Sequence, residues 1–166
     1  ARLLARIETR ADSSHRVDTT LQTAAAQLKI DGTIAPAFDT LDLNYSAEMP
    51  RLAPFGAVAG NELSGSATLS GKVSGPVASP TVTALLEGRE VAAAGQPLGA
   101  VRGELRAADV ATAAKGNLSF RASPPQGAVQ IATDFAMSDN ALRLTGTRVG
   151  APGGSIDGQM TVPLDG

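Results

Sequence analysis

The sequence predicts an all-β protein built from antiparallel strands. Small or apolar residues alternate with polar ones without a break from Leu63 to Val73. That period of two is typical of a strand with one dry face and one wet face. A Gly- and Pro-rich turn at 75–80 follows, and a second alternating run covers 81–87. Most of the 166 residues repeat this plan, and this length suffices for one domain with a sizeable core.

The other strands are predicted from the same period of two, with turn residues between them. The stretch Leu21 to Leu28 also fits a helical spacing, which its alanines favour, but Ala26, Leu28 and Ile30 alternate and favour a strand. Between Met49 and Ala59 the apolar spacing changes to three and four, which predicts one short helix near residues 50–59. Strands are expected near residues 3–10, 17–23, 26–30, 41–47, 101–105, 118–120, 129–135, 142–144 and 156–162. Gly103 and Gly158 are the positions where a β-bulge is expected to shift the alternation.

Two segments share a plan of strand, glycine, alanine, proline and strand. They lie near residues 28–47 and 63–87, and the second copy contains one inserted residue. Glycine supplies a permissive backbone, and proline ends ladder pairing at the start of the next strand. The repeat predicts a modular sheet, and chance similarity in a chain rich in glycine and proline is the alternative.

Composition narrows the function classes. The chain has no Cys, no Trp, one Tyr and four Phe, so its apolar side chains are mostly small. Each large aromatic ring buries about 150 to 250 Å² in an ordinary core, and a thin, extended sheet tolerates its absence better than a thick globule does. The formal net charge of −2 provides no basic face for phosphate backbones, so we expect no nucleic-acid partner.

The sequence shows neither a signal peptide nor a run of about 20 apolar residues that would span a membrane as a helix. Alternation is already under way at Leu3, and the sequence stops just past another strand. We therefore expect residues 1–166 to be one continuous segment of a longer protein.

Nothing in the sequence predicts catalysis. The only histidine, His15, lies beside Ser14 and near two aspartates, but neighbours on an extended turn point apart and do not form a nucleophile and base pair. No phosphate loop, dinucleotide fingerprint or metal-ligand cluster is present. We expect no enzymatic activity, no cofactor and no metal.

Several sequence segments resemble the recurring module of the TamB family within the AsmA-like group. They are the Leu-Ala-Pro-Phe segment at 52–55, the alternating strand at 63–75, and the Pro-Thr-Val restart at 80–82. Leu142 to Gly146 and Gly154 to Val162 resemble the family's pattern of a strand followed by Gly-Gly-x-Ile-x-Gly. The resemblance covers residues 50–166 well, and residues before 50 only in style.

The resemblance implies an elongated, curled, mainly antiparallel sheet that forms an open apolar trough. It also implies a periplasmic conduit that shields phospholipid acyl chains between the inner and outer membranes. The full-length protein would be anchored in the inner membrane and reach an outer-membrane barrel partner, TamA. The residues expected to line the groove are Ile7, Leu28, Ile30, Leu41, Leu43, Leu63, Leu69, Val73, Val82, Leu86, Val101, Leu105, Leu118, Phe120, Val129, Ile131, Phe135, Leu142, Leu144, Ile156, Met160 and Val162.

Three other hypotheses stay open. The dry faces would pack against each other in a closed β-sandwich. The chain would alternatively be a structural solenoid or adhesin segment, although a repeat of about forty residues with insertions is unlike short coils. Lastly, a free sheet edge would assist assembly of an outer-membrane barrel or autotransporter by strand augmentation.

Overall fold

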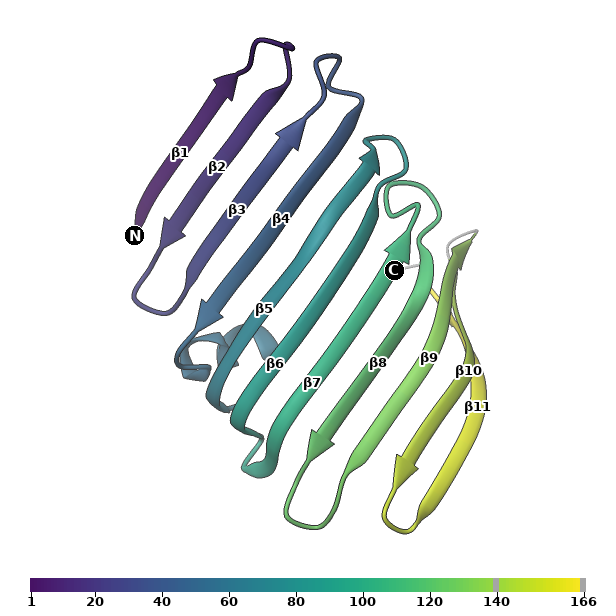
Figure 1. Ribbon diagram of the computed structural model, residues 1–166. Helices are drawn as coiled ribbons and strands as arrows, with labels where there is room; N and C mark the ends of the chain where they lie inside the picture. The colour runs from purple at the N-terminus through teal and green to yellow at the C-terminus, as the bar shows by residue number, and fades with distance from the viewer. Residues whose placement is uncertain (139–140, 165–166) are drawn as a thin grey trace.

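The computed structural model describes residues 1–138 and 141–164 and shows one antiparallel sheet of 11 strands (Figure 1). The strands lie side by side in chain order, so each strand pairs with the strand that follows it in the sequence. The elements are β1 (Arg2–Thr9), β2 (His15–Gln22), β3 (Gln27–Ile34), β4 (Thr40–Met49), η1 (Ala53–Phe55), α1 (Gly56–Ala59), β5 (Leu63–Pro76), β6 (Thr81–Ala93), β7 (Gln96–Ala108), β8 (Lys115–Ser123), β9 (Val129–Ser138), β10 (Ala141–Ala151) and β11 (Gly154–Pro163).

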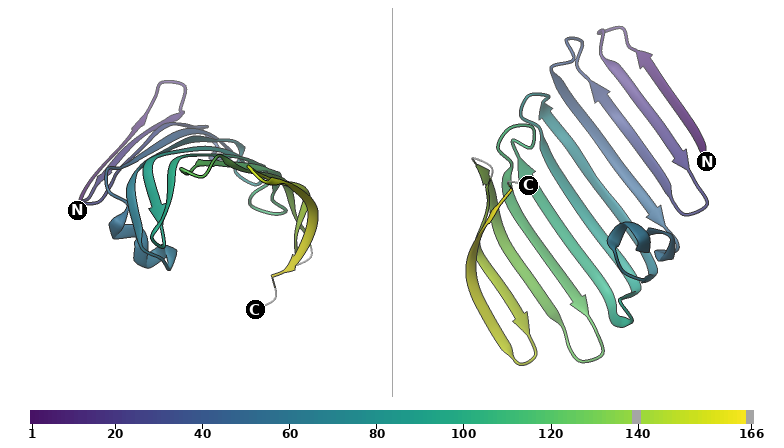
Figure 2. Two further views of the ribbon diagram at one scale, coloured as in Figure 1. Left: turned by 90° about the horizontal axis from the view of Figure 1, so that it is seen from below. Right: turned by 180° about the vertical axis from the view of Figure 1, so that it is seen from behind.

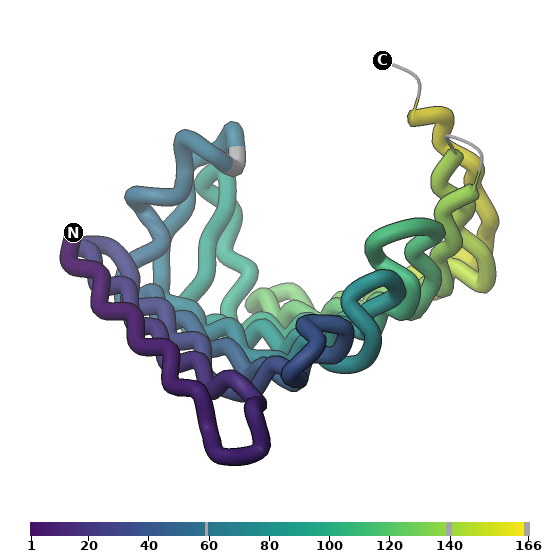
Figure 3. Tube along the Cα trace, turned by 90° about the horizontal axis from the view of Figure 1, so that it is seen from above, coloured from purple at the N-terminus to yellow at the C-terminus, as the bar shows by residue number. Residues whose placement is uncertain are grey.

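The sheet stays open, because β1 and β11 are its two edges and do not pair with each other. Viewed end-on, the sheet is arched, and β1 and β11 lie at the two ends of the arch (Figure 2, left; Figure 3). The arch has a hollow on its concave side, and the sheet does not curl round on itself. The all-β class, the antiparallel pairing and the open sheet that were predicted from the sequence are confirmed.

The strand register assigns each side chain to one of two faces, because residues paired across a ladder point to the same side of a sheet. We call the side that carries Leu69 the apolar face and the opposite side the polar face. Leu69 pairs with Ala47 on β4 and with Leu86 on β6. The same register extends outward through every ladder and places the predicted dry residues together.

The apolar face lines the hollow. Val91, Val101 and Ala122 form a small buried cluster on this face, and Leu52 from the β4–β5 connection packs against it. The η1–α1 segment that follows Leu52 lies on the hollow side of the sheet (Figure 2, right; Figure 3). The structure therefore confirms the short helix predicted near residues 50–59 and shows which face it covers.

The sheet has almost no core in the usual sense. The buried apolar residues among those described are Ala67, Val91, Val101, Ala107 and Ala122, and no side chain among them is completely enclosed. The described residues form a single sheet, with no second sheet packed on the apolar face. The closed β-sandwich, which the sequence left as an alternative, is therefore not formed by the described residues.

One detail of the strand prediction, the position of the bulges, is wrong. The β5–β6 register shifts between Ser64 and Ser66, but the extra residue lies on β6, between Arg89 and Ala92, opposite Gly65. The predicted alternation from Leu63 to Val73 therefore continues along β5 through this bulge. Gly103 is regularly paired, whereas the shift opposite Gly158 arises on β10, between Leu144 and Thr147.

The ambiguous stretch between Leu21 and Leu28 forms a hairpin rather than a continuous strand. The Thr23 hydroxyl accepts hydrogen bonds from the backbone N–H groups of Ala25 and Ala26 and donates to the Ala26 carbonyl. A threonine that bonds its own turn in this way competes with strand pairing. The two weak repeats, near residues 28–47 and 63–87, each fold as one hairpin, β3–β4 and β5–β6.

Candidate functional site

Two rows of apolar residues cross the entire sheet on the hollow side. Each row takes one residue from every strand, and neighbours in a row are direct ladder partners. Every member is aliphatic, aromatic, methionine or glycine. The first row is Ile7, Val17, Gly32, Leu43, Val73, Val82, Ala107, Gly116, Phe135, Leu144 and Met160. The second is Leu3, Leu21, Leu28, Ala47, Leu69, Leu86, Gly103, Phe120, Ile131, Val149 and Ile156.

The residues expected to line the groove lie together on this face, and Leu63 is among them, because its ladder partner Ala93 lies two residues from the buried Val91 on β6. Most of them are half-buried, and Val101 is buried. At the two ends of the arch they are largely exposed, with 70% of Ile7 and 73% of Ile156 accessible. Leu118, Ile131, Met160 and Val162 are also exposed. Apart from the patch around Val91 and Val101, on which Leu52 packs, the hollow therefore presents an apolar surface that nothing in the described chain covers.

The charged side chains lie on the opposite side. Every charged residue that has a ladder partner in the described strands belongs to the polar face. Arg102 binds Glu87 and Glu104 at 2.7 and 2.9 Å, and Lys72 binds Asp42. The hydrogen bond to Glu104 raises the pKa of Arg102 above its usual value. These exposed pairs contribute little to stability, about 0 to 1 kcal/mol each. Their significance is that they all lie on the polar face, which leaves the apolar face without charge.

A middle row between the two apolar rows carries hydroxyl groups, and the protein itself bonds those of Tyr45, Thr133 and Thr147, while the Thr19 hydroxyl of the same row forms no hydrogen bond with the described residues. The Tyr45 hydroxyl donates to the Thr83 carbonyl at 2.9 Å, and burial raises the pKa of Tyr45, so the phenol keeps its proton. The Thr133 and Thr147 hydroxyls lie 2.8 Å apart, and Thr133 is the buried polar residue of the described chain. The hydroxyls of Tyr45, Thr133 and Thr147 are thus already engaged within the protein.

Glycines let large side chains lie flat on the sheet. A Cβ at Gly71 would overlap both the Thr83 carbonyl and the Tyr45 hydroxyl, so the Tyr45 ring occupies the space above Gly71. Likewise, a Cβ at Gly88 would come within 2.7 Å of methyl groups of Val91 and Val101. Sequence reasoning missed this role, because the partners are far apart in the chain and meet only through the strand register.

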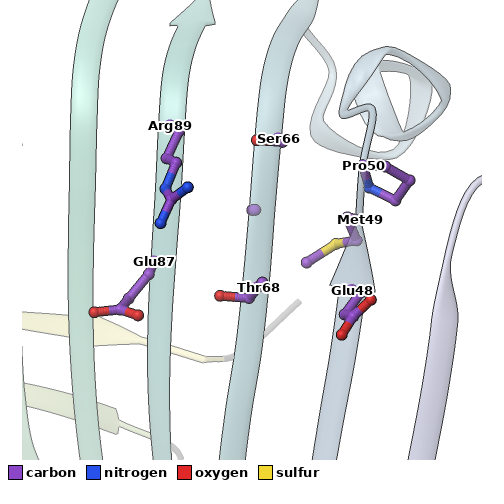
Figure 4. Close-up of a pocket in the computed structure, with 8 residues that line it drawn as sticks. Glu48, Met49, Pro50, Ser66, Thr68, Glu87 and Arg89 are labelled. Atoms are coloured by element: carbon purple, nitrogen blue, oxygen red, sulfur yellow. The ribbon is translucent and has the colours of Figure 1, made fainter.

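A shallow depression of about 310 Å³ lies outside the hollow (Figure 4). The ladder residues Glu48, Thr68 and Glu87 on its floor belong to the polar face, and Arg89 lies beside Glu87. A small mixed-charge depression of this kind on the wet side is not part of the apolar surface. Among residues 1–138 and 141–164 no group of three or more His, Cys, Asp or Glu side chains is placed to hold a metal ion.

No helix in the described part of the chain is long and apolar enough to cross a membrane. Comparison with known proteins finds no matching family model, no matching curated protein and no matching solved structure. What this chain can do therefore follows from the chemistry of its two faces.

Proposed function

We propose that this chain is a segment of a periplasmic lipid conduit, whose hollow shields phospholipid acyl chains on their way between the inner and outer membranes. The observation that carries the proposal is the pair of unbroken apolar rows on an uncovered concave face. A soluble protein rarely leaves so large an apolar surface exposed unless a ligand, a partner or a membrane covers it.

The chemistry of the hollow favours an acyl chain as the occupant. Each methylene group transferred from water to an apolar surface contributes about 0.8 kcal/mol, without any specific polar contact. Tyr45, Thr133 and Thr147 bond within the protein, so the hollow presents few polar groups for a headgroup to bind. The headgroup of a bound lipid would stay outside in water.

The distribution of charge supports the same occupant. A carboxylate or ammonium on the apolar face would have to be desolvated when an acyl chain lay over it, at a cost of several kcal/mol. Each paired charge lies on the polar face instead. The compartment, the inner-membrane anchor and the barrel partner TamA belong to this proposal through the resemblance to the TamB family.

Assembly of outer-membrane barrels or autotransporters by strand augmentation is the second candidate. The observation that favours it is the pair of free edges at β1 and β11, where every residue of each strand is exposed. Unpaired edge strands are templates for pairing with another chain. This function would use the edges and leave the apolar face without a ligand, so lipid occupancy separates the two candidates.

The test is native mass spectrometry of the purified chain, with Ile131→Asp compared with Ala132→Asp. The two residues are neighbours on β9 that point to opposite faces, and both are exposed. We expect bound phospholipid in the wild type and in Ala132→Asp, and its loss in Ile131→Asp. Circular dichroism confirms that both variants keep the sheet, since each carboxylate reaches water. A folded wild type without phospholipid, or equal occupancy in both variants, contradicts the proposal.

A further inference from the structure

Exposed apolar side chains gather at one end of the sheet. Because neighbouring strands are antiparallel and follow chain order, all odd-numbered strands end at the same edge, which we call the turn rim. Phe38, Val77 and Val110 lie in the turns after β3, β5 and β7, and Leu164 follows β11. Their exposed fractions are 59, 45, 37 and 47%. At the opposite end, Val58 is the large apolar residue outside the strands that is exposed in the described chain.

The turns of the rim are joined to one another. The Val77 N–H donates to the Asp39 carbonyl at 2.8 Å, and the Val110 N–H donates to the Pro80 carbonyl at 3.4 Å. These bonds link the three successive turns side by side, as their positions in Figure 1 show. The apolar tips therefore form one continuous edge rather than separate mobile loops.

Phe38 connects this rim to the hollow. Its ring stacks on His15, with ring centroids 4.5 Å apart, and the register places His15 on the apolar face beside Ile34. Phe38 also has a positive φ of 56°, a conformation that is unfavourable for a non-glycine residue. An exposed aromatic side chain is thus held at the mouth of the hollow against the preference of its own backbone.

The charges of the rim indicate which kind of membrane surface it can bind. The turns at 35–39, 77–80 and 109–114 contain no Lys or Arg. Asp109 is paired with Lys115 at 3.0 Å, so Asp39 is the one acidic group of these turns without an ion pair among the described residues. The turn after β1, on the same rim, contains Arg10 and Asp12, whose charges offset each other. The rim therefore has no excess of cations for an anionic lipid headgroup and would engage a membrane through its apolar tips.

We propose that the turn rim docks on the surface of a zwitterionic bilayer, where Phe38, Val77 and Val110 insert at the level of the headgroups. The proposal rests on the proposed function, because docking there lets an acyl chain pass from the bilayer across Phe38 into the hollow without contact with water. Insertion by apolar tips predicts binding that is insensitive to salt, since no charge pair contributes to it.

The chain lacks tryptophan, so Phe38→Trp provides a single fluorescent reporter that keeps an aromatic ring on His15. Val58→Trp, at the opposite end, is the matched control and starts from a more exposed position. With phosphatidylcholine vesicles we expect the indole emission of the Phe38→Trp variant to shift to the blue and to be quenched by brominated acyl chains. The Val58→Trp variant should show neither effect. Adding Val77→Asp and Val110→Asp to Phe38→Trp should lower partitioning on the order of tenfold.

The absence of a shift in the Phe38→Trp variant, or equal shifts for both reporters, would overturn the docking proposal. A shift that depends on protein concentration without vesicles would also overturn it, because it would assign the rim to a second copy of the chain. Lipid occupancy of the hollow is measured without vesicles, so loss of rim docking and loss of the conduit function give different results.

Discussion

At the residue scale, the apolar face depends on pairs of one large and one small side chain. The Tyr45 ring lies over Gly71 on the neighbouring strand, and its hydroxyl reaches across to the Thr83 carbonyl on the strand beyond. A tyrosine on a dry face would otherwise expose a hydroxyl in the hollow. The pair therefore keeps this part of the face flat and leaves the Tyr45 hydroxyl bonded within the protein.

Gly71→Ala tests this arrangement. The new Cβ would overlap the Thr83 carbonyl, which belongs to the backbone, so the strands must move apart. We expect the free energy of unfolding to fall by about 1 to 3 kcal/mol, the usual cost of overpacking. Urea denaturation followed by circular dichroism measures the change.

Gly103→Ala is the matched control, since Gly103 lies on the same face and beside Phe120. Its Cβ would be 3.6 Å from both Leu86 and Phe120, which is an ordinary contact. We expect stability to stay the same or to rise by up to about 1 kcal/mol, because alanine restricts the unfolded chain. Equal destabilisation by both substitutions would contradict the role given to Gly71.

At the scale of single elements, much of the fold could be predicted from the sequence, because alternation is a local property. The strands, the helix near residues 50–59 and the face of residues such as Leu105 and Phe135 follow from a period of two or of three and four. The bulges could not be predicted in this way, because a glycine in a strand looks the same whether it is regularly paired, as Gly103 is, or lies opposite a bulge, as Gly65 does. The turn at Thr23 was missed because alanines near it continue an alternating pattern.

The bulge opposite Gly65 gives a prediction at this scale. Gly65 and Gly75 lie on the same strand with the same positive φ of 98°, so alanine is equally strained at both. A Cβ at Gly65 would also come within 2.8 Å of the backbone of Arg89 and Glu90, whereas nothing lies within 4 Å at Gly75. Gly65→Ala should therefore lower the unfolding free energy by about 1 to 3 kcal/mol more than Gly75→Ala does.

The difference between the two denaturation midpoints removes the shared cost of the positive φ and reports only on the contact with β6. If both variants unfold at the same urea concentration, the tight bulge that turns β5 and β6 away from a regular ladder is not present in solution.

At the scale of the whole molecule, the chain is a single layer whose apolar side remains open. In most antiparallel sheets the apolar face is covered by a second layer. Here the described strands follow one another across the sheet, so none is left to fold back over the hollow. The sequence could predict the dry face, but not whether it was covered, because coverage depends on how distant strands are placed.

This arrangement explains why the charges and the hydroxyls are placed as they are. Two apolar rows run across all strands, the Tyr45, Thr133 and Thr147 hydroxyls between them bond within the protein, and the ion pairs lie on the other face. Each feature keeps the hollow suited to a ligand that consists of hydrocarbon. The same geometry leaves β1 and β11 free to pair, so further strands on either side would extend the hollow.

Photo-crosslinking in cells from adjacent positions on β7 tests most directly whether the apolar face binds phospholipid. Leu105 is half-buried on the apolar face, and Arg106 is exposed on the polar face of the same strand, far from the bulges. Phe135 and Asp134 on β9 form a second pair of the same kind. We expect a photoreactive residue at 105 or 135 to capture phospholipid, and one at 106 or 134 not to. Equal capture from both faces, or none from 105 and 135 in a folded protein, would contradict the account.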